Sequence, residues 1–169
     1  NEIINGLIEL IKKPNLSDEE LMKIIPGPDF PTGGEVLLSN GIKETYFKGK
    51  GSIAMRGVAH IEEVIPGKGK HKRTGIVITE LPYQVSKSGW IEKLAEQVND
   101  GKIHGIADIR DETDRSGMRI LIEIRRDSDP NKILKDLYRK TNLQSNYGAI
   151  LLALVNGQPK QLSLKDLLV

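Results

Sequence analysis

The hydrophobic positions follow a helical period at the start of the chain. The first apolar residues share one face of a helix that ends before Pro14: Ile3, Ile4, Leu7, Ile8 and Ile11. A second short helix follows, because Ser17 and Glu20 have the spacing of a capping box. The prolines and glycines of residues 26–34 then exclude regular structure. The pattern predicts two N-terminal helices and a connector over residues 1–34.

From Ser52 the period changes to two, which is typical of a strand. Apolar residues alternate with polar ones over Ile53, Met55, Gly57, Ala59 and Ile61. A second strand, residues 75–81 ("GIVITEL"), follows after a glycine-spaced basic segment. We expect the two strands to form a long projecting β-hairpin arm with the basic segment at its tip.

The rest of the chain alternates strands and helices. Ser86 caps a helix that carries Trp90, which we interpret as a core residue. Residues 106–110 and 118–124 are predicted strands, and the second alternates Ile with Arg or Glu as if one sheet face were wet. Asp129-Pro130 begins another helix, and residues 148–155 form a last strand. The β-α-β-β-α-β order predicts a two-layer α+β domain over residues 35–169, with a mixed, mainly antiparallel sheet.

Composition excludes several classes of function. Of 169 residues 38% are hydrophobic, and 25 basic against 23 acidic residues give a net charge of +2, so net charge does not indicate a polyanion partner. The chain has no cysteine, which excludes disulfides, thiolate catalysis and a cysteine-ligated zinc site. No apolar run approaches the ~18 residues of a membrane span. The chain begins without methionine and ends on "LKDLLV", and we expect it to be an excised domain.

The local distribution of charge is more informative. The segment "PGKGKHKRTG" (residues 66–75) contains basic residues and no acid. Other basic residues lie at the base and on the polar face of the first predicted strand, so all would form one stripe along the arm. The candidate DNA backbone contacts are Lys48, Lys50, Arg56, Lys68, Lys70, Lys72 and Arg73. The alternative is that these lysines only keep an exposed hairpin soluble.

Other candidate chemistry is weak. His60, His71 and His104 lack metal-ligand spacing, and no G-x-S-x-G motif is present. Asp111 and its acidic neighbours could attract magnesium, but "DETDRSG" (residues 111–117) is better explained as a solvated turn. We predict no catalytic, cofactor or metal residue. Aromatic residues near the arm are scarce, which argues against recognition of single strands.

Several motifs resemble one family strongly. They are "IPGPDFPTGG" (25–34), "GKGSIAMRG" (49–57), "ITELPYQVSK" (78–87), "IADIRDETDRSGMRI" (106–120) and "NGQPKQLSLKDLL" (156–168). They resemble the A subunit of DNA gyrase, in the tower between the catalytic winged-helix region and the coiled coil. Topoisomerase IV shares most of them, and "NGQPK" is more similar to gyrase. Glu35, where we expect an apolar residue, and the long basic tip depart from the pattern.

The resemblance implies a type IIA topoisomerase, which passes one duplex through another and, in gyrase, supercoils DNA negatively with ATP. ATP and magnesium would be held by the partner B subunit of an A2B2 heterotetramer, in the bacterial cytoplasm at the nucleoid or in an organelle of bacterial origin. This fragment would support duplex DNA, and alone it would be monomeric. The nucleophilic tyrosine would be absent, since Tyr46, Tyr83, Tyr138 and Tyr147 do not match its motif.

Two other functions remain open. The fragment could be a rigid spacer in the A chain of gyrase or topoisomerase IV, or an unrelated ferredoxin-like domain that binds a ligand or RNA. The lack of aromatic residues on the predicted central strands argues against RNA. The order of the elements alone assigns no function.

Overall fold

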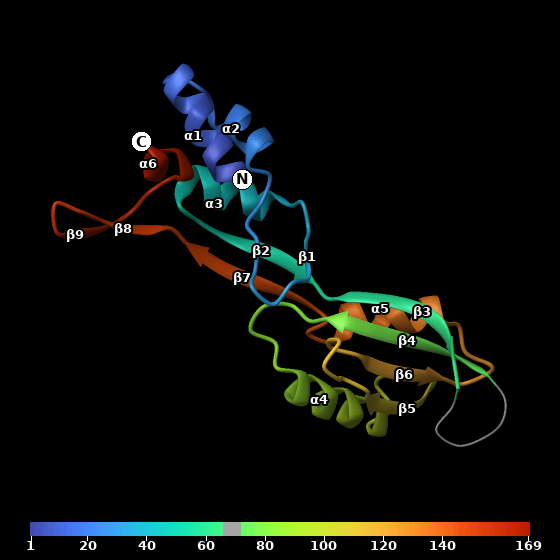
Figure 1. Cartoon of the computed structure of the whole chain (residues 1–169). Coiled ribbons are helices and arrows are strands. Elements are labelled where there is room, and N and C mark those ends of the chain that lie inside the picture. The colour runs from blue at the N-terminus through green and yellow to red at the C-terminus, as the bar shows by residue number, and fades with distance from the viewer. Residues whose placement is uncertain (66–71) are drawn as a thin grey trace. The chain divides into compact units, whose positions relative to one another are not determined.

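The computed structural model describes residues 1–65 and 72–169, and it combines helices with antiparallel sheets (Figure 1). The predicted α+β class is therefore confirmed. The helices are α1 (Glu2–Lys12), α2 (Asp18–Ile24), α3 (Asn40–Lys48), α4 (Lys87–Asn99), α5 (Pro130–Lys140) and α6 (Leu164–Leu168). The strands are β1 (Glu35–Val36), β2 (Lys50–Arg56), β3 (Val58–Val64), β4 (Arg73–Glu80), β5 (Ile106–Asp111), β6 (Ile120–Ile124), β7 (Gln144–Ile150), β8 (Leu152–Val155) and β9 (Gln158–Gln161).

The chain divides into two compact units. The first unit contains Asn1–Asp29, Val36–Ala54 and Asn146–Val169, and the second contains Phe30–Glu35 and Met55–Ser145. In each unit, segments that are far apart along the chain pack together. In the described part of the chain, no helix combines the length and the apolar character needed to cross a bilayer.

Both predicted N-terminal helices are present in the first unit. The capping box of α2 forms as expected, with the Glu20 amide donating to the Ser17 hydroxyl at 3.2 Å. The buried residues of α1 are Gly6 and Leu10, and a Cβ added at Gly6 would lie 2.7 Å from a side-chain carbon of Ile25. The absence of a side chain at Gly6 therefore lets α1 and the end of α2 approach closely. The isoleucines of the predicted apolar face, Ile3, Ile4, Ile8 and Ile11, are exposed.

The helix α3 is not predicted by the sequence pattern. It begins at Asn40 without a side-chain cap, and Gly41 is required because a Cβ there would lie 1.7 Å from the carbonyl oxygen of Ser52. Inside the helix, the buried Thr45 hydroxyl donates to the carbonyl of Gly41 at 2.7 Å. A side chain at position 41 would therefore prevent the close packing of α3 against β2.

The second unit is built on a four-stranded sheet with the order β3-β4-β6-β5, in which every pair is antiparallel. Alternate residues of β4 and β6 face α4 and α5, and these buried side chains form the main core of the unit. Trp90, on α4, is 3% exposed, so its interpretation as a core residue is confirmed. The N-cap residues of both helices are the predicted ones, Ser86 and Asp129.

The hairpin between β3 and β4 is present, but the predicted projecting arm is wrong in two respects. The long first strand is two strands, β2 and β3, in different sheets, because the strand is interrupted at Gly57, whose amide donates to the carbonyl of Leu143 at 2.7 Å. In addition, β4 pairs with β6 from Gly75 to Ile78, so it is an inner strand there. The continuous apolar run of this strand is explained by burial on both faces.

The sheet face opposite α4 and α5 is only partly exposed to solvent. Val77 and Leu121 are fully buried on it together with Val64. Glu123, expected to point into water, is only 3% exposed. A carboxylate at this depth needs a charged partner, and Arg110 of the neighbouring strand β5 supplies it.

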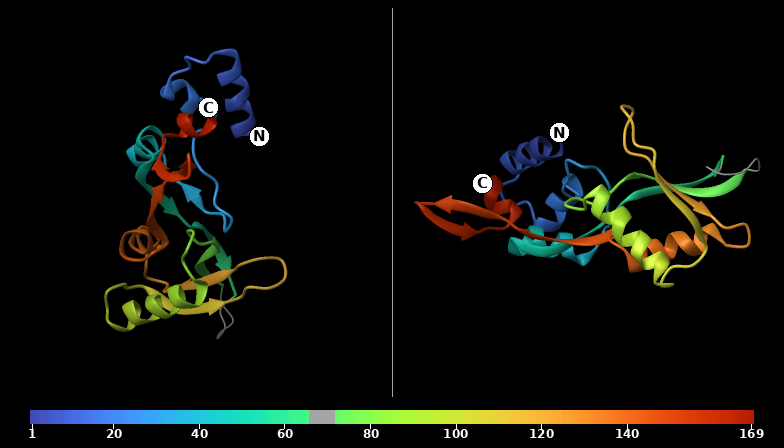
Figure 2. Two further views of the ribbon diagram at one scale, coloured as in Figure 1. Left: turned by 90° about the vertical axis from the view of Figure 1, so that its left-hand side faces the viewer. Right: turned by 90° about the horizontal axis from the view of Figure 1, so that it is seen from below.

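The C-terminal strand prediction is correct in type but not in extent. Residues 148–155 are divided between β7 and β8, because the amide of Leu151 donates out of the ladder to the carbonyl of Gly49 at 2.7 Å. β8 then pairs with β9 through Asn156-Gly157, both with positive φ (Figure 2). Since β7 lies in a sheet with β1 and β2, the elements from β4 to β7 do not form one sheet.

Candidate nucleic-acid interface

Lys48 and Lys50 lie on either side of a rigid turn in the first unit. Gly49 between them adopts the left-handed conformation, with φ of 72°, and its amide donates to Thr45 as α3 ends. The side chain of Gln161 holds the carbonyl of Lys48 at 2.6 Å. Both lysine side chains are exposed, and no described acid pairs with them. The turn therefore presents two free ammonium groups from a fixed backbone, which suits contact with phosphate.

Arg56 has a different environment in the second unit. Its Nε and Nη2 donate to the Gln144 side-chain oxygen at 3.2 and 2.9 Å, and its guanidinium lies 4.3 Å from the centre of the Tyr138 ring. The Tyr138 hydroxyl donates to the carbonyl of Gly57 at 3.3 Å. Arg56 therefore stabilises the chain around Gly57, where β2 gives way to β3, and only part of its hydrogen-bonding capacity remains for phosphate.

Lys72 and Arg73 lie together where β4 begins. The Lys72 ammonium is 3.3 Å from the Glu63 carboxylate, but both side chains are about three-quarters exposed, at 75% and 73%. Such a pair is screened by water and stabilises little, so a phosphate can replace the carboxylate. Arg73 faces Val64 across the hairpin, and no described acid pairs with it.

The remaining predicted contacts, Lys68 and Lys70, lie outside the described residues. Lys48 and Lys50 belong to the first unit, whereas Arg56, Lys72 and Arg73 belong to the second. The structure thus brings together two pairs, Lys48 with Lys50 and Lys72 with Arg73. A single basic stripe that joins all seven residues stays a prediction.

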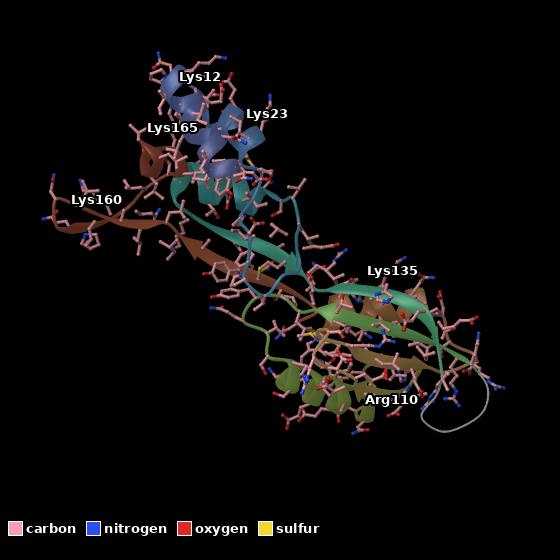
Figure 3. The ribbon with its side chains drawn as sticks, viewed as in Figure 1. Lys12, Lys23, Arg110, Lys135, Lys160 and Lys165 are labelled. Carbon is pink, nitrogen blue, oxygen red and sulfur yellow. The ribbon has the colours of Figure 1, made fainter. Side chains whose placement is uncertain are left out.

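Sequence reasoning missed the basic character of α5. This helix carries Lys132, Lys135, Arg139 and Lys140 against one acid, Asp136. Asp136 pairs with Arg139 at 3.0 Å and with Lys140 at 3.8 Å, which leaves Lys132 and Lys135 without an acidic partner among the described residues. Lys135 projects from α5 one turn before Tyr138, the residue that stacks on Arg56 (Figure 3). The spacing of three residues between Lys132 and Lys135 was a signal for a shared helical face.

The helix-free face of the sheet contains a second charged cluster that the sequence did not indicate. Glu62 accepts from Arg119 and lies 2.9 Å from the His60 ring, and the Arg119 guanidinium lowers the pKa of Glu62 below its usual range. The buried Glu123 carboxylate is 3.1 Å from Arg110 Nη2. Cations and anions are interleaved in this cluster, so its described charges largely offset one another.

Two acidic side chains of residues 111–117 have partners within the protein. Asp111 pairs with Lys87 at 2.8 Å, and the ammonium holds the pKa of this carboxyl at about 2. Asp114 accepts from the amide of Ser116 at 2.8 Å. Over residues 1–65 and 72–169, no group of three His, Cys, Asp or Glu side chains is arranged to hold a metal ion.

Comparison with known proteins shows which family the chain belongs to. The family model for the A subunit of DNA gyrase and topoisomerase IV matches residues 1–169. The chain belongs to this family. It is 61% identical over 168 residues to the DNA topoisomerase 4 A subunit of Synechocystis and 55% identical over 167 residues to the DNA gyrase A subunit of the same organism. It is also 52% identical over 167 residues to the DNA gyrase A subunit of Halalkalibacterium halodurans.

Each of these matches covers 99% of this chain but only 18%, 19% and 19% of the respective relative. The chain therefore spans about a fifth of the length of its gyrase and topoisomerase IV relatives. The matches cover the motifs that carried the resemblance, from residues 25–34 to residues 156–168.

Two tyrosines of this gyrase/topoisomerase IV segment have a raised pKa. Burial raises the pKa of Tyr46 to about 12, with added repulsion from the negative charges of Glu2 and Asp29. Burial also raises the pKa of Tyr138, although Arg56 opposes the shift. Tyr83 stacks on Phe30 with ring centres 5.4 Å apart. A raised pKa disfavours the phenolate that a nucleophilic tyrosine needs, so Tyr46 and Tyr138 suit structural roles.

Proposed function

We propose that this chain is a non-catalytic part of the A subunit of a type IIA topoisomerase and that it holds duplex DNA through the phosphate backbone. The observation that carries the proposal is the match of the gyrase/topoisomerase IV family over the whole chain. The pairs Lys48–Lys50 and Lys72–Arg73 supply the charges that phosphate contact requires. DNA, the B subunit, ATP and magnesium would belong to the complete cytoplasmic enzyme rather than to these residues.

Contact with phosphate alone gives weak binding with little sequence preference. We expect a dissociation constant above ~10 μM at physiological salt, as for non-specific binders. The test is fluorescence anisotropy of two labelled 20–30 base-pair duplexes of different sequence (a length of about two to three helical turns) titrated with the chain. Equal affinities that fall with salt would support the proposal, whereas no binding at low salt would favour the rigid spacer.

The parent protein could be a gyrase or a topoisomerase IV, and each has one observation in its favour. The "NGQPK" motif favours gyrase, whereas the 61% identity to the Synechocystis topoisomerase 4 protein, against 55% for its gyrase counterpart, favours topoisomerase IV. Exchange of the matching segment in each Synechocystis protein for this chain separates them. ATP-dependent negative supercoiling that survives only in the gyrase background indicates gyrase. Survival of activity only in the topoisomerase 4 background indicates the second candidate.

A further inference from the structure

The exposed apolar side chains are distributed unevenly in the described structure. All of the large hydrophobic residues that are exposed, except Ile65, belong to the first unit. The most regular group lies on α1, where Ile4, Ile8 and Ile11 are 59%, 43% and 79% exposed. Isolated apolar residues are common on protein surfaces, but a contiguous row marks an interaction site.

The spacing of this row fits a helical partner. Ile4, Ile8 and Ile11 follow each other at intervals of four and three residues, the spacing of a seam between two packed helices. The opposite side of α1, at Gly6 and Leu10, already packs against the end of α2. Asn5, Glu9 and Lys12 form a separate polar stripe, so the apolar surface of α1 is wider than its contact with α2 covers.

The charges beside the row are internally balanced. Lys12, at the end of α1, donates to Glu9 at 2.9 Å, so neither residue requires a charge on the partner (Figure 3). Recognition at this face would depend on apolar packing and on shape. An amphipathic helix with its own apolar seam matches both requirements.

The size of the face decides between a second copy and a tethered partner. An independent interface buries about 800 Å² on each side, more than the isoleucines of one three-turn helix expose. A helix in the same polypeptide needs less, because tethering supplies an effective concentration in about the millimolar range. The chain spans only about a fifth of the length of its relatives, so most of such a polypeptide lies elsewhere.

We infer that the outer face of α1, formed by Ile4, Ile8 and Ile11, docks against an amphipathic helix of the same polypeptide outside these residues. The chain has no cysteine, so a single introduced thiol reports on one position. Ile8→Cys and Ile11→Cys are made in the chain alone and in the complete Synechocystis topoisomerase 4 A subunit with this chain in place of its matching segment. The rate of reaction with a maleimide is measured for each, after removal of other reactive cysteines.

We expect both thiols to react rapidly in the chain alone and about tenfold or more slowly in the complete protein. Lys13→Cys, exposed on the same segment but off the row, is the matched control and should react equally fast in both. Equal rates at Ile8→Cys and Ile11→Cys in the two proteins would overturn the inference. Protection in the chain alone that grows with its concentration would also overturn it, because the occupant would then be a second copy.

Discussion

The double substitution Lys72→Ala/Arg73→Ala tests whether the start of β4 contacts DNA. Lys72 is 3.3 Å from Glu63, and both side chains are about three-quarters exposed, so loss of this pair changes the folded state little. Arg73 lies at the end of the β3–β4 ladder, where no described acid pairs with it. Any large effect of the substitution on DNA binding would therefore come from lost phosphate contacts.

The magnitude follows from counterion release. If Lys48, Lys50, Arg56, Lys72 and Arg73 each meet a phosphate, the log–log salt slope is about −4.5, and a loss of two contacts changes it to about −2.7. Between about 50 and 200 mM salt, affinity would then fall about 40-fold for the variant instead of about 500-fold for the unchanged chain. The slope is the quantity to compare, because it counts contacts and is insensitive to small changes in affinity.

The assay is anisotropy of a labelled duplex at several salt concentrations, with thermal unfolding to verify the fold. Lys12→Ala/Lys13→Ala removes the same net charge from the end of α1 and is the matched control, which should leave the slope unchanged. A slope that Lys72→Ala/Arg73→Ala does not alter would refute contact at the start of β4. An equal flattening by both double variants would show that only net charge matters.

Three further predictions concern stability. Gly49→Ala should destabilise the chain by about 1–3 kcal/mol in chemical unfolding, because φ is 72° and the new Cβ would lie 2.3 Å from the Leu162 carbonyl. The control is Gly148→Ala, whose new Cβ would meet no atom within 4 Å and which should be nearly neutral. Leu94→Ala, at a position 1% exposed, should cost about 2–5 kcal/mol and lower the melting temperature, whereas the exposed Lys93→Ala should change it little. Lys87, together with hydrogen bonds from Thr113, lowers the pKa of Asp111 from 3.8 to about 2, so these contacts stabilise the fold above pH 3.8 and lose this effect as pH falls toward about 2. In urea unfolding, Lys87→Met should therefore be less stable than the unchanged chain at pH 5, and the difference should shrink as pH falls toward about 2.

Local signals predicted the elements whose residues determine their own conformation. The Ser17–Glu20 capping box and the Asp129-Pro130 start lie where the sequence places them. Each depends on residues within one turn that provide hydrogen-bond acceptors for the free amides at the start of the helix or remove one of them, so no distant contact is needed to form it. Trp90 was assigned correctly to the core for a similar reason, since its helical phase matches that of the other buried residues.

The predictions from sequence are wrong where contacts with residues far along the chain determine the packing or the limits of an element. The apolar period of α1 identified the helix, but the close approach at Gly6 decided which side packs. The strand period runs through Gly57 without a break, although a Cβ there would lie 2.6 Å from the Glu80 carbonyl, and the strand divides at this residue. For the candidate site, exposure of Lys48 and Lys50 followed from their charge, whereas the interactions of Arg56 with Gln144 and Tyr138 required the tertiary structure.

The buried pair of Arg110 and Glu123 has a consequence for how β5 finds its place. β5 is an edge strand, and its register with β6 shifts between Ile106 and Asp108. A slip by one residue would turn Arg110 toward α4 and α5 and away from Glu123, and the ion pair between them would be lost. Misaligned forms would therefore lose an ion pair at a carboxylate that is only 3% exposed, and the pair favours one alignment of the sheet edge.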